Sequence, residues 1–234
     1  MNILGAIFPL GNFRDPNNHH DTLDGNLQRS LPFARACLLR GDADQCFRSL
    51  LFQAALSYAS IDKRVAFYTP VPFQSLPSLV HNLVPSALAT ANLHLIQFHY
   101  LSTLADVHKH LLHLSADVII LDGYLEFPLA DEDDRFRIVS ACALLRDTYA
   151  HLTRARPDDD LILLCSCTCA DASMADVEQR GLFDLAVDIE MLEDGDYHAD
   201  VHVRSTNEIS CRVNFRIGHR DILPLTATVQ HRTE

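Results

Sequence analysis

An apolar run that ends on a carboxylate constrains the fold of this chain more than any other feature. Residues 118–123 read VIILDG, so four branched apolar side chains precede Asp122. A continuous apolar run is typical of a strand that is buried on both faces of a parallel sheet. Nucleotide-binding sheets place an acid at the end of such a strand to hold Mg²⁺. An aspartate that only caps the next element would give the same pattern, and the run alone favours that alternative.

Composition limits the classes of protein to which the chain can belong. Its 234 residues are 48% hydrophobic, which is enough to bury the core of one α/β domain. No run is long enough to span a membrane, and the first ten residues are too few for a signal peptide. The seven cysteines are expected to be buried thiols. The net charge of −12 argues against a general binder of polyanions.

Strands and helices are predicted to alternate in the first three quarters of the chain. The expected strands are 34–39, 64–68, 93–100, 118–122 and 161–164, and the expected helices are 47–58, 102–114, about 131–155 and 174–181. Four strands then follow one another, at 185–191, 199–204, 208–217 and 222–229. This order predicts an α/β fold with a mostly parallel central sheet flanked by helices and with C-terminal antiparallel strands. Residues 1–30 are expected to be a flexible N-terminal segment, and 31–234 a single domain.

The segment before the first long helix lacks a standard phosphate-binding loop. Such a loop reads GxxxxGK[ST], in which backbone N–H groups and the lysine hold the phosphates. Residues 41–49 read GDADQCFRS, with one glycine and no lysine. The sequence therefore predicts the frame of a nucleotide-binding protein with an altered phosphate site.

Four stretches, in this order and spacing, resemble RecA-like recombinase paralogues, and most closely the ATPase-like subunit of the metazoan Shu complex (the Swsap family). They read SLLFQAAL (49–56), PFQSLP (72–77), IQFHYLSTL (96–104) and ILDGYLE (120–126). The resemblance spans residues 35–164, and beyond them only the order of strands is similar. It implies a RecA-like P-loop core over residues 31–234.

The resemblance also implies a function. Proteins of this kind support homologous recombination in the nucleus, where they promote assembly of a recombinase filament on single-stranded DNA. The implied partners are a SWIM-type zinc-finger protein and a RecA-like recombinase, with single-stranded DNA bound through the complex and no membrane. ATP and Mg²⁺ are the implied cofactors if the altered loop still binds nucleotide.

The nucleotide-binding positions of the family can be carried over one by one. In ungapped register the phosphate lysine falls on Phe47 and the Mg²⁺-binding hydroxyl on Arg48, whereas a shift by one places Arg48 and Ser49 on the Lys-Ser pair. The vestigial nucleotide-binding set is therefore Gly41, Arg48, Ser49 and Asp122, with Asp122 as the Mg²⁺ ligand.

Two further positions bear on catalysis. Ser166 and Thr168 follow the strand that senses the γ-phosphate in the family, and we treat them as sensor-like residues. Residues 68–73, where the water-orienting glutamate is expected, contain no acid. We therefore expect a degenerate ATPase that serves as a scaffold. The alternatives are an active ATPase stimulated by single-stranded DNA, with a non-standard loop, and an unrelated α/β protein in which Asp122 only caps.

Contacts with DNA and with other subunits can also be predicted. The two loops that would reach DNA, 124–134 and 170–176, are acidic and would repel phosphate. The candidate DNA-binding residues are basic side chains of the C-terminal strands: Arg204, Arg212, Arg216 and Arg220. A solvated strand face is the favoured alternative for them. Phe33 and Ala36 fit the F-x-x-A pattern by which recombinase subunits associate, and are candidate recombinase contacts.

Two groups of potential metal ligands are assigned to structural roles. Cys165, Cys167 and Cys169 lie about 7 Å apart along an extended strand, too far for one zinc ion, so buried thiols are expected. His108, His110 and His113 are expected on a solvated helix face.

Overall fold

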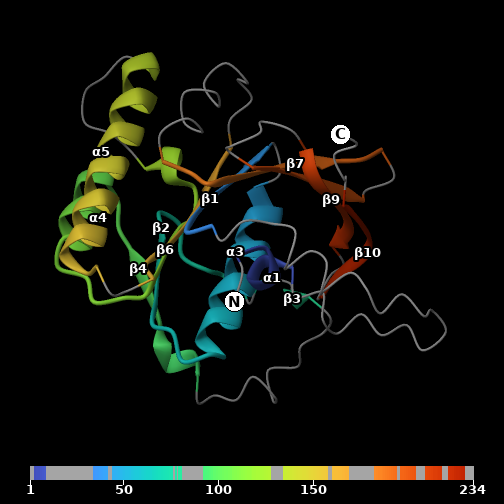
Figure 1. The fold of residues 1–234 in the computed structure, drawn as a ribbon, viewed down its shortest axis with the longest axis horizontal. Helices are drawn as coiled ribbons and strands as arrows, with labels where there is room; N and C mark the ends of the chain where they lie inside the picture. Colours follow the sequence, from blue (N-terminus) through green and yellow to red (C-terminus); the bar gives the residue numbers. More distant parts are fainter. Residues whose placement is uncertain are drawn as a thin grey trace.

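Ten strands form one sheet in the computed structural model, which describes residues 3–8, 34–41, 44–75, 77, 79–80, 92–127, 134–157, 160–168, 182–193, 196–203, 209–217 and 221–229 (Figure 1). Their order across the sheet is β3-β10-β9-β8-β7-β1-β6-β5-β2-β4. The strands are β1 (Ala36–Gly41), β2 (Val65–Thr69), β3 (Leu79–Val80), β4 (Ile96–Tyr100), β5 (Val118–Leu121), β6 (Ile162–Cys167), β7 (Leu185–Met191), β8 (Tyr197–Val203), β9 (Ile209–Ile217) and β10 (Asp221–Val229).

One half of the sheet is parallel. The strands β7, β1, β6, β5, β2 and β4 all run in the same direction, with Cys37 of β1 opposite Leu164 of β6 and Leu185 of β7. The carboxyl ends of these strands therefore meet at one edge, where ligands of open α/β sheets bind. Beyond β7 the sheet continues as an antiparallel meander through β8, β9 and β10, and the short strand β3 pairs in parallel with β10 at the edge. The predicted fold class is confirmed.

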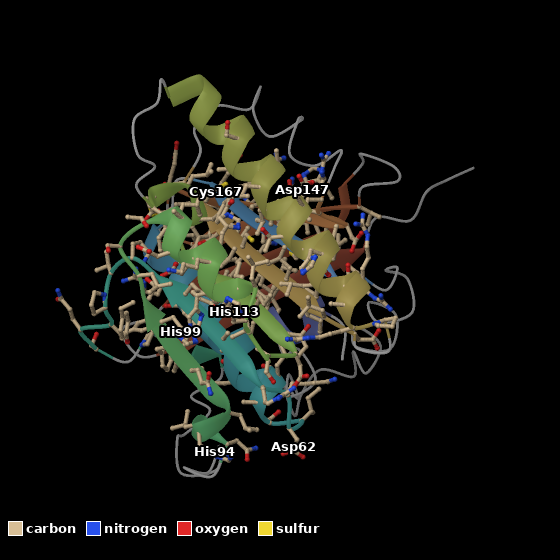
Figure 2. The ribbon with its side chains drawn as sticks, turned by 90° about the vertical axis from the view of Figure 1, so that its left-hand side faces the viewer. Asp62, His94, His99, His113, Asp147 and Cys167 are labelled. Atoms are coloured by element: carbon tan, nitrogen blue, oxygen red, sulfur yellow. The ribbon has the colours of Figure 1, made fainter. Side chains whose placement is uncertain are left out.

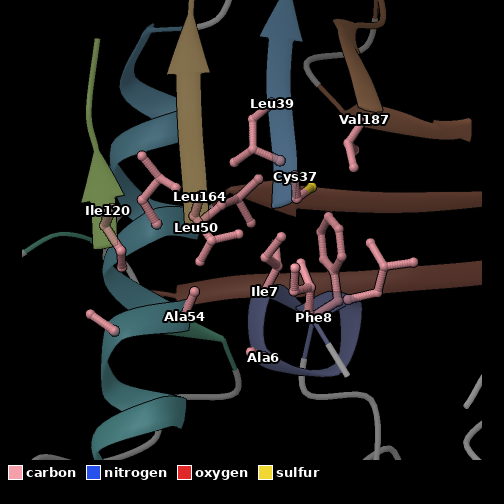
Figure 3. Close-up of a cluster of buried hydrophobic side chains, with 14 of the residues drawn as sticks. Ala6, Ile7, Phe8, Cys37, Leu39, Leu50, Ala54, Ile120, Leu164 and Val187 are labelled. Atoms are coloured by element: carbon pink, nitrogen blue, oxygen red, sulfur yellow. The ribbon is translucent and has the colours of Figure 1, made fainter. Parts of the chain in front are cut away.

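Helices cover both faces of the parallel half. The helices α1 (Ile3–Ile7) and α3 (Asp44–Ala59) lie on one face, and α4 (Leu104–Leu111) and α5 (Asp134–Ala155) lie on the other (Figure 1). One hydrophobic cluster lies on each face of the sheet, and successive side chains of β1 alternate between the two clusters. Leu39 packs near Leu50 of α3 (Figure 3), whereas Leu38 belongs to the cluster that contains Leu145 of α5. Burial on both sides explains the continuous apolar runs of the parallel strands.

The first residues of the chain belong to the core, so the expectation of a flexible segment over residues 1–30 is wrong for residues 3–8. Ile3, Ile7 and Phe8 are at most 1% exposed, and Figure 3 shows Ile7 and Phe8 in the hydrophobic cluster. The ring centre of Phe8 lies 5.5 Å from that of Phe215. The hydroxyl of Ser57 on α3 donates a hydrogen bond of 2.9 Å to the carbonyl oxygen of Ala6. A short apolar run can be ordered in this way because packing, and not its own length, stabilises it. The rest of the expected segment, residues 9–30, lies outside the described residues.

Other expected elements differ at their ends. The helix α4 begins later than predicted because the Thr103 hydroxyl caps it, accepting a hydrogen bond from the backbone N–H of Asp106, and it ends at Leu111. A short 3-10 helix, Leu93–Leu95, replaces the beginning of the strand expected at 93–100. The helix expected at 174–181 lies outside the described residues. Within the described part of the chain, each helix is too short or too polar to cross a membrane.

Candidate nucleotide site

Polar side chains from three neighbouring strands meet at the carboxyl edge of the sheet. Asp122 follows β5, Thr69 ends β2, and Ser166 lies near the end of β6. The Thr69 hydroxyl donates to Asp122 Oδ2 at 2.9 Å, and the Ser166 hydroxyl lies 3.5 Å from Asp122 Oδ1. The backbone N–H of Gly123 donates to Ser166 Oγ at 2.9 Å. The structure thus brings Asp122 and Ser166 together, and the sensor role of Ser166 stays a prediction.

Arg48 completes this cluster from α3. Its Nε donates to Asp122 Oδ2 at 2.8 Å, and its Nη2 donates to Thr69 Oγ1 at 3.3 Å. The guanidinium carbon lies 5.3 Å from the centre of the Phe73 ring, within the range of a cation–π contact. Three separate interactions therefore hold the guanidinium against Asp122.

Because Asp122 is buried, its ion pair with Arg48 helps to keep the carboxyl group charged. Only 4% of Asp122 is exposed, and burial raises the pKa of its carboxyl group, while the charge of Arg48 and the hydrogen bonds from Thr69, Arg48 and Ser166 oppose the rise. A buried carboxylate needs such partners to remain ionised. Mg²⁺ would have to displace Arg48 from Asp122 Oδ2 in order to bind there.

Both registers of the phosphate loop place Arg48 at a nucleotide-binding position, and the structure brings it to Asp122. In P-loop proteins a hydroxyl of the loop and the acid at the strand end hold the same magnesium ion, so the two side chains are close in space. Arg48 contacts the acid directly. Phe47, on which the lysine falls in the ungapped register, is 2% exposed, in the apolar core. A cation of the protein thus lies beside the carboxylate that is expected to hold the metal ion.

Gly41 has a structural reason to be glycine. Its φ is +144°, and a Cβ atom at this position would lie 2.0 Å from the carbonyl oxygen of Ile189 on β7. The close approach of β1 to β7 therefore requires glycine whether or not phosphate binds. Ser49 is a buried residue of α3, and the hydrogen bonds to Asp122 come from Arg48, Thr69 and Ser166.

The remaining predicted residues lie elsewhere. Thr168 donates to Glu126 Oε1 at 3.3 Å, and this contact directs its hydroxyl to a different carboxylate from that of Asp122. Ala36 is 1% exposed inside β1, so its methyl group contacts the chain's own core. Phe33, its partner in the F-x-x-A pattern, lies outside the described residues.

The candidate DNA-binding arginines are engaged in ion pairs. Arg212 donates to Asp200 through Nε and Nη2, at 2.5 and 2.6 Å, and Arg216 makes the same two-point contact with Asp196. Each positive charge is therefore neutralised by a neighbouring acid on the strand face, which reduces its attraction for phosphate. Contact of these arginines with DNA stays a prediction, and Arg204 and Arg220 lie outside the described residues.

His108 differs from the expectation of a solvated helix face. It is 6% exposed, and its ring nitrogens lie 3.0 Å from Thr148 Oγ1 and 3.2 Å from the Tyr124 hydroxyl. The Tyr124 hydroxyl donates to the Ala141 carbonyl oxygen at 2.6 Å, so it accepts from His108 Nε2. Burial lowers the pKa of His108 to about 4, which keeps the ring neutral.

The expectation of buried thiols is confirmed for two of the three strand cysteines. Cys165 and Cys167 are at most 2% exposed, and Cys169 lies outside the described residues.

Comparison with known proteins places the fold. No protein-family model matches the chain, and no curated protein sequence matches it. The structure is similar to that of a KaiC-like protein from the hyperthermophilic archaeon Pyrococcus horikoshii, with a TM-score of 0.51, 11% identity and coverage of 82% of this chain and 89% of that chain. It is also similar to the flagellar accessory protein FlaH from Methanocaldococcus jannaschii, with a TM-score of 0.53, 12% identity and the same coverage. The chain therefore has a RecA-like fold.

Proposed function

We propose that the chain is a RecA-fold scaffold of homologous recombination, a subunit of a Shu-type complex whose nucleotide site has been closed by an arginine. In this proposal it pairs with a SWIM-type zinc-finger protein in the nucleus. The pair promotes assembly of a recombinase filament on single-stranded DNA. The observation that carries the scaffold role is the insertion of Arg48 between Asp122, Thr69 and Phe73.

The energetics of this arrangement support a closed site. A charge-assisted hydrogen bond is worth about 1.5–3 kcal/mol. Binding of Mg²⁺ at Asp122 would break the bond from Arg48 and leave the guanidinium to find other partners. The loop offers no lysine to hold the phosphates in compensation. We therefore expect the folded chain to prefer its own ion pair over Mg²⁺-ATP.

A second feature supports the absence of hydrolysis. Thr69, at the end of β2, donates to Asp122, and the residues that follow it are Pro70, Val71, Pro72 and Phe73. Phe73 packs against Arg48, and its ring lies 5.8 Å from that of Phe52. The segment that would supply a water-orienting glutamate instead supplies an apolar contact to the arginine.

The recombination context rests on the resemblance of residues 35–164, and the RecA-like fold agrees with it. Two of the four resembling stretches contain side chains that contact Arg48. Residues 120–126 contain Asp122, and 72–77 contain Phe73. The identity of the partners is part of the proposal.

A reconstitution experiment tests the proposal. The chain is mixed with a SWIM-domain partner, a RecA-like recombinase and single-stranded DNA, and filament assembly is followed with the wild type and with the double variant Arg48→Gln/Asp122→Asn. The double variant removes both charges while it keeps groups that can hydrogen-bond, so we expect wild-type filament assembly.

The matched control is Arg64→Gln/Asp117→Asn. Arg64 and Asp117 form an ion pair of 3.3 Å at the amino ends of β2 and β5, whereas Asp122 and Thr69 lie at the carboxyl ends of these strands. Loss of assembly in the Arg48→Gln/Asp122→Asn variant alone would support the alternative of a working ATPase. Failure of the wild-type chain to bind either protein would refute the recombination role.

A further inference from the structure

Two histidines and a tyrosine form a second cluster, on the α4 side of the sheet. Tyr68 lies on β2, His99 on the neighbouring strand β4, and His110 on α4. The Tyr68 hydroxyl lies 2.8 Å from His110 Nδ1. The ring centres of His99 and His110 are 4.4 Å apart, and His99 also stacks on Tyr68 at 4.8 Å. Figure 2 shows His99, with His113 just beyond the end of α4, on the side of the molecule that faces the viewer.

One atom of this cluster has no hydrogen-bond partner among the described residues. This atom is His99 Nε2, and it is buried. Burial, followed by the neighbouring His110, lowers the pKa of His99, so the ring is neutral at physiological pH. A buried polar atom without a partner costs about 1–3 kcal/mol and usually indicates a water molecule or an ion.

The contact between Tyr68 and His110 prepares the second imidazole. When His110 Nδ1 carries the proton, it donates to the Tyr68 oxygen, and Nε2 then presents a lone pair. Histidines that bind metals are commonly held in this way by a hydrogen bond from the other ring nitrogen.

The spacing of the two rings fits a shared ion. Two imidazoles with nitrogens about 2.0–2.1 Å from one metal, at angles between a right angle and a tetrahedral one, have ring centres roughly 4.5–5 Å apart. The observed 4.4 Å is close to this range. We propose that His99 and His110 bind one borderline divalent metal ion, of the class of Zn²⁺ or Ni²⁺, and that the Tyr68 hydroxyl orients His110.

The remaining coordination positions fall to water. Within the described part of the chain no cluster of three or more His, Cys, Asp and Glu side chains could hold a metal, so the two imidazoles supply the protein ligands. His110 is exposed, which gives the ion access from solvent. The side chains of this site are different from those that contact the Asp122 carboxylate, so the proposal does not depend on the scaffold function.

Isothermal titration of the full chain with Ni²⁺ tests this site. Ni²⁺ suits imidazole ligands, which limits interference from the seven cysteines. We expect the variants His110→Gln and His99→Gln to bind one fewer equivalent of Ni²⁺ than the wild type. Tyr68→Phe should bind it about tenfold more weakly, as for loss of an orienting hydrogen bond.

His113→Gln is the matched control, because His113 is exposed and lies three residues from His110. It should bind Ni²⁺ as the wild type does. Circular dichroism of each variant checks the fold, and His110→Gln provides the decisive comparison because His110 is exposed. Equal binding by the wild type and His110→Gln, or no binding by the wild type, would overturn the proposal.

Discussion

Replacement of Arg48 by methionine would leave Asp122 as a buried carboxylate without its cationic partner. Methionine keeps a long apolar side chain against Phe73, so the change mainly removes charge. The side chain of Asp122 is 6% exposed and that of Arg48 is 28% exposed. Loss of one partner from a buried ion pair typically costs 3–5 kcal/mol. Because Arg48 is partly solvated and Thr69 still donates to Asp122, we expect the lower value, about 3 kcal/mol at pH 7.

The pH dependence of this loss is the distinctive part of the prediction. Burial already raises the pKa of Asp122, and without Arg48 the pKa rises further. A carboxyl group whose pKa is higher in the folded state than in the unfolded state destabilises the folded protein progressively as pH rises from the unfolded-state pKa to the folded-state pKa. The loss should therefore be clearly smaller at pH 5 than at pH 7, because part of the Asp122 carboxyl group of the variant is then protonated and uncharged.

Urea unfolding followed by far-ultraviolet circular dichroism measures this effect, since the chain contains no tryptophan. The double variant Arg48→Met/Asp122→Asn should recover most of the lost stability, because no buried charge remains. Arg64→Met is the matched control. Arg64 is 52% exposed in its ion pair with Asp117, and its loss should cost less than about 1 kcal/mol. The reasoning is refuted if Arg48→Met is as stable as Arg64→Met at pH 7, or if its loss of stability is the same at pH 5.

Three other predictions concern single positions. The pKa of His108 is lowered to about 4, so the stability that depends on its neutral form should be lost as pH falls from about 6.5 towards 4; His108→Gln should show a smaller change in unfolding free energy between pH 7 and pH 5 than the wild type. Gly41→Ala should lower the unfolding free energy by about 3 kcal/mol in urea titration, because the new Cβ meets the Ile189 carbonyl oxygen; wild-type stability would contradict the close approach. Arg212→Gln and Arg216→Gln should leave the affinity for single-stranded DNA and its salt dependence unchanged, because aspartates already neutralise both arginines; a weaker salt dependence in fluorescence anisotropy would instead indicate phosphate contacts.

The acidic strand and its surroundings could be predicted because they follow from local pattern. The run at 118–121 indicated a buried strand, and the family resemblance singled out Ser166 after another strand. The rule that parallel strands end at one edge explains why the two residues meet. The same rule could have identified Thr69, the polar residue that ends the apolar run 65–68. The ion pair itself could not be predicted, because Arg48 and Asp122 are 74 positions apart and only the packing of α3 brings them together.

Two errors at the sequence level have physical causes. Residues 3–8 are grouped with the polar, turn-rich residues 11–30 in the sequence-based expectation of a flexible segment, yet their apolar side chains are buried beside α3. The polarity of His108 led to the prediction that it lies on a solvated helix face. Its spacing from Leu104, Val107 and Leu111 puts it on the apolar face of α4, and that periodicity was the available signal.

ATP hydrolysis by the purified chain, with its SWIM-domain partner, single-stranded DNA and Mg²⁺, tests the central claim most directly. The comparison is between the wild type, Asp122→Asn, and the control Asp117→Asn at the opposite end of the strand. If Arg48 closes the nucleotide site, the wild type will show no turnover above that of Asp122→Asn. Turnover that is lost in Asp122→Asn and kept in Asp117→Asn would contradict the claim and establish the chain as a working ATPase.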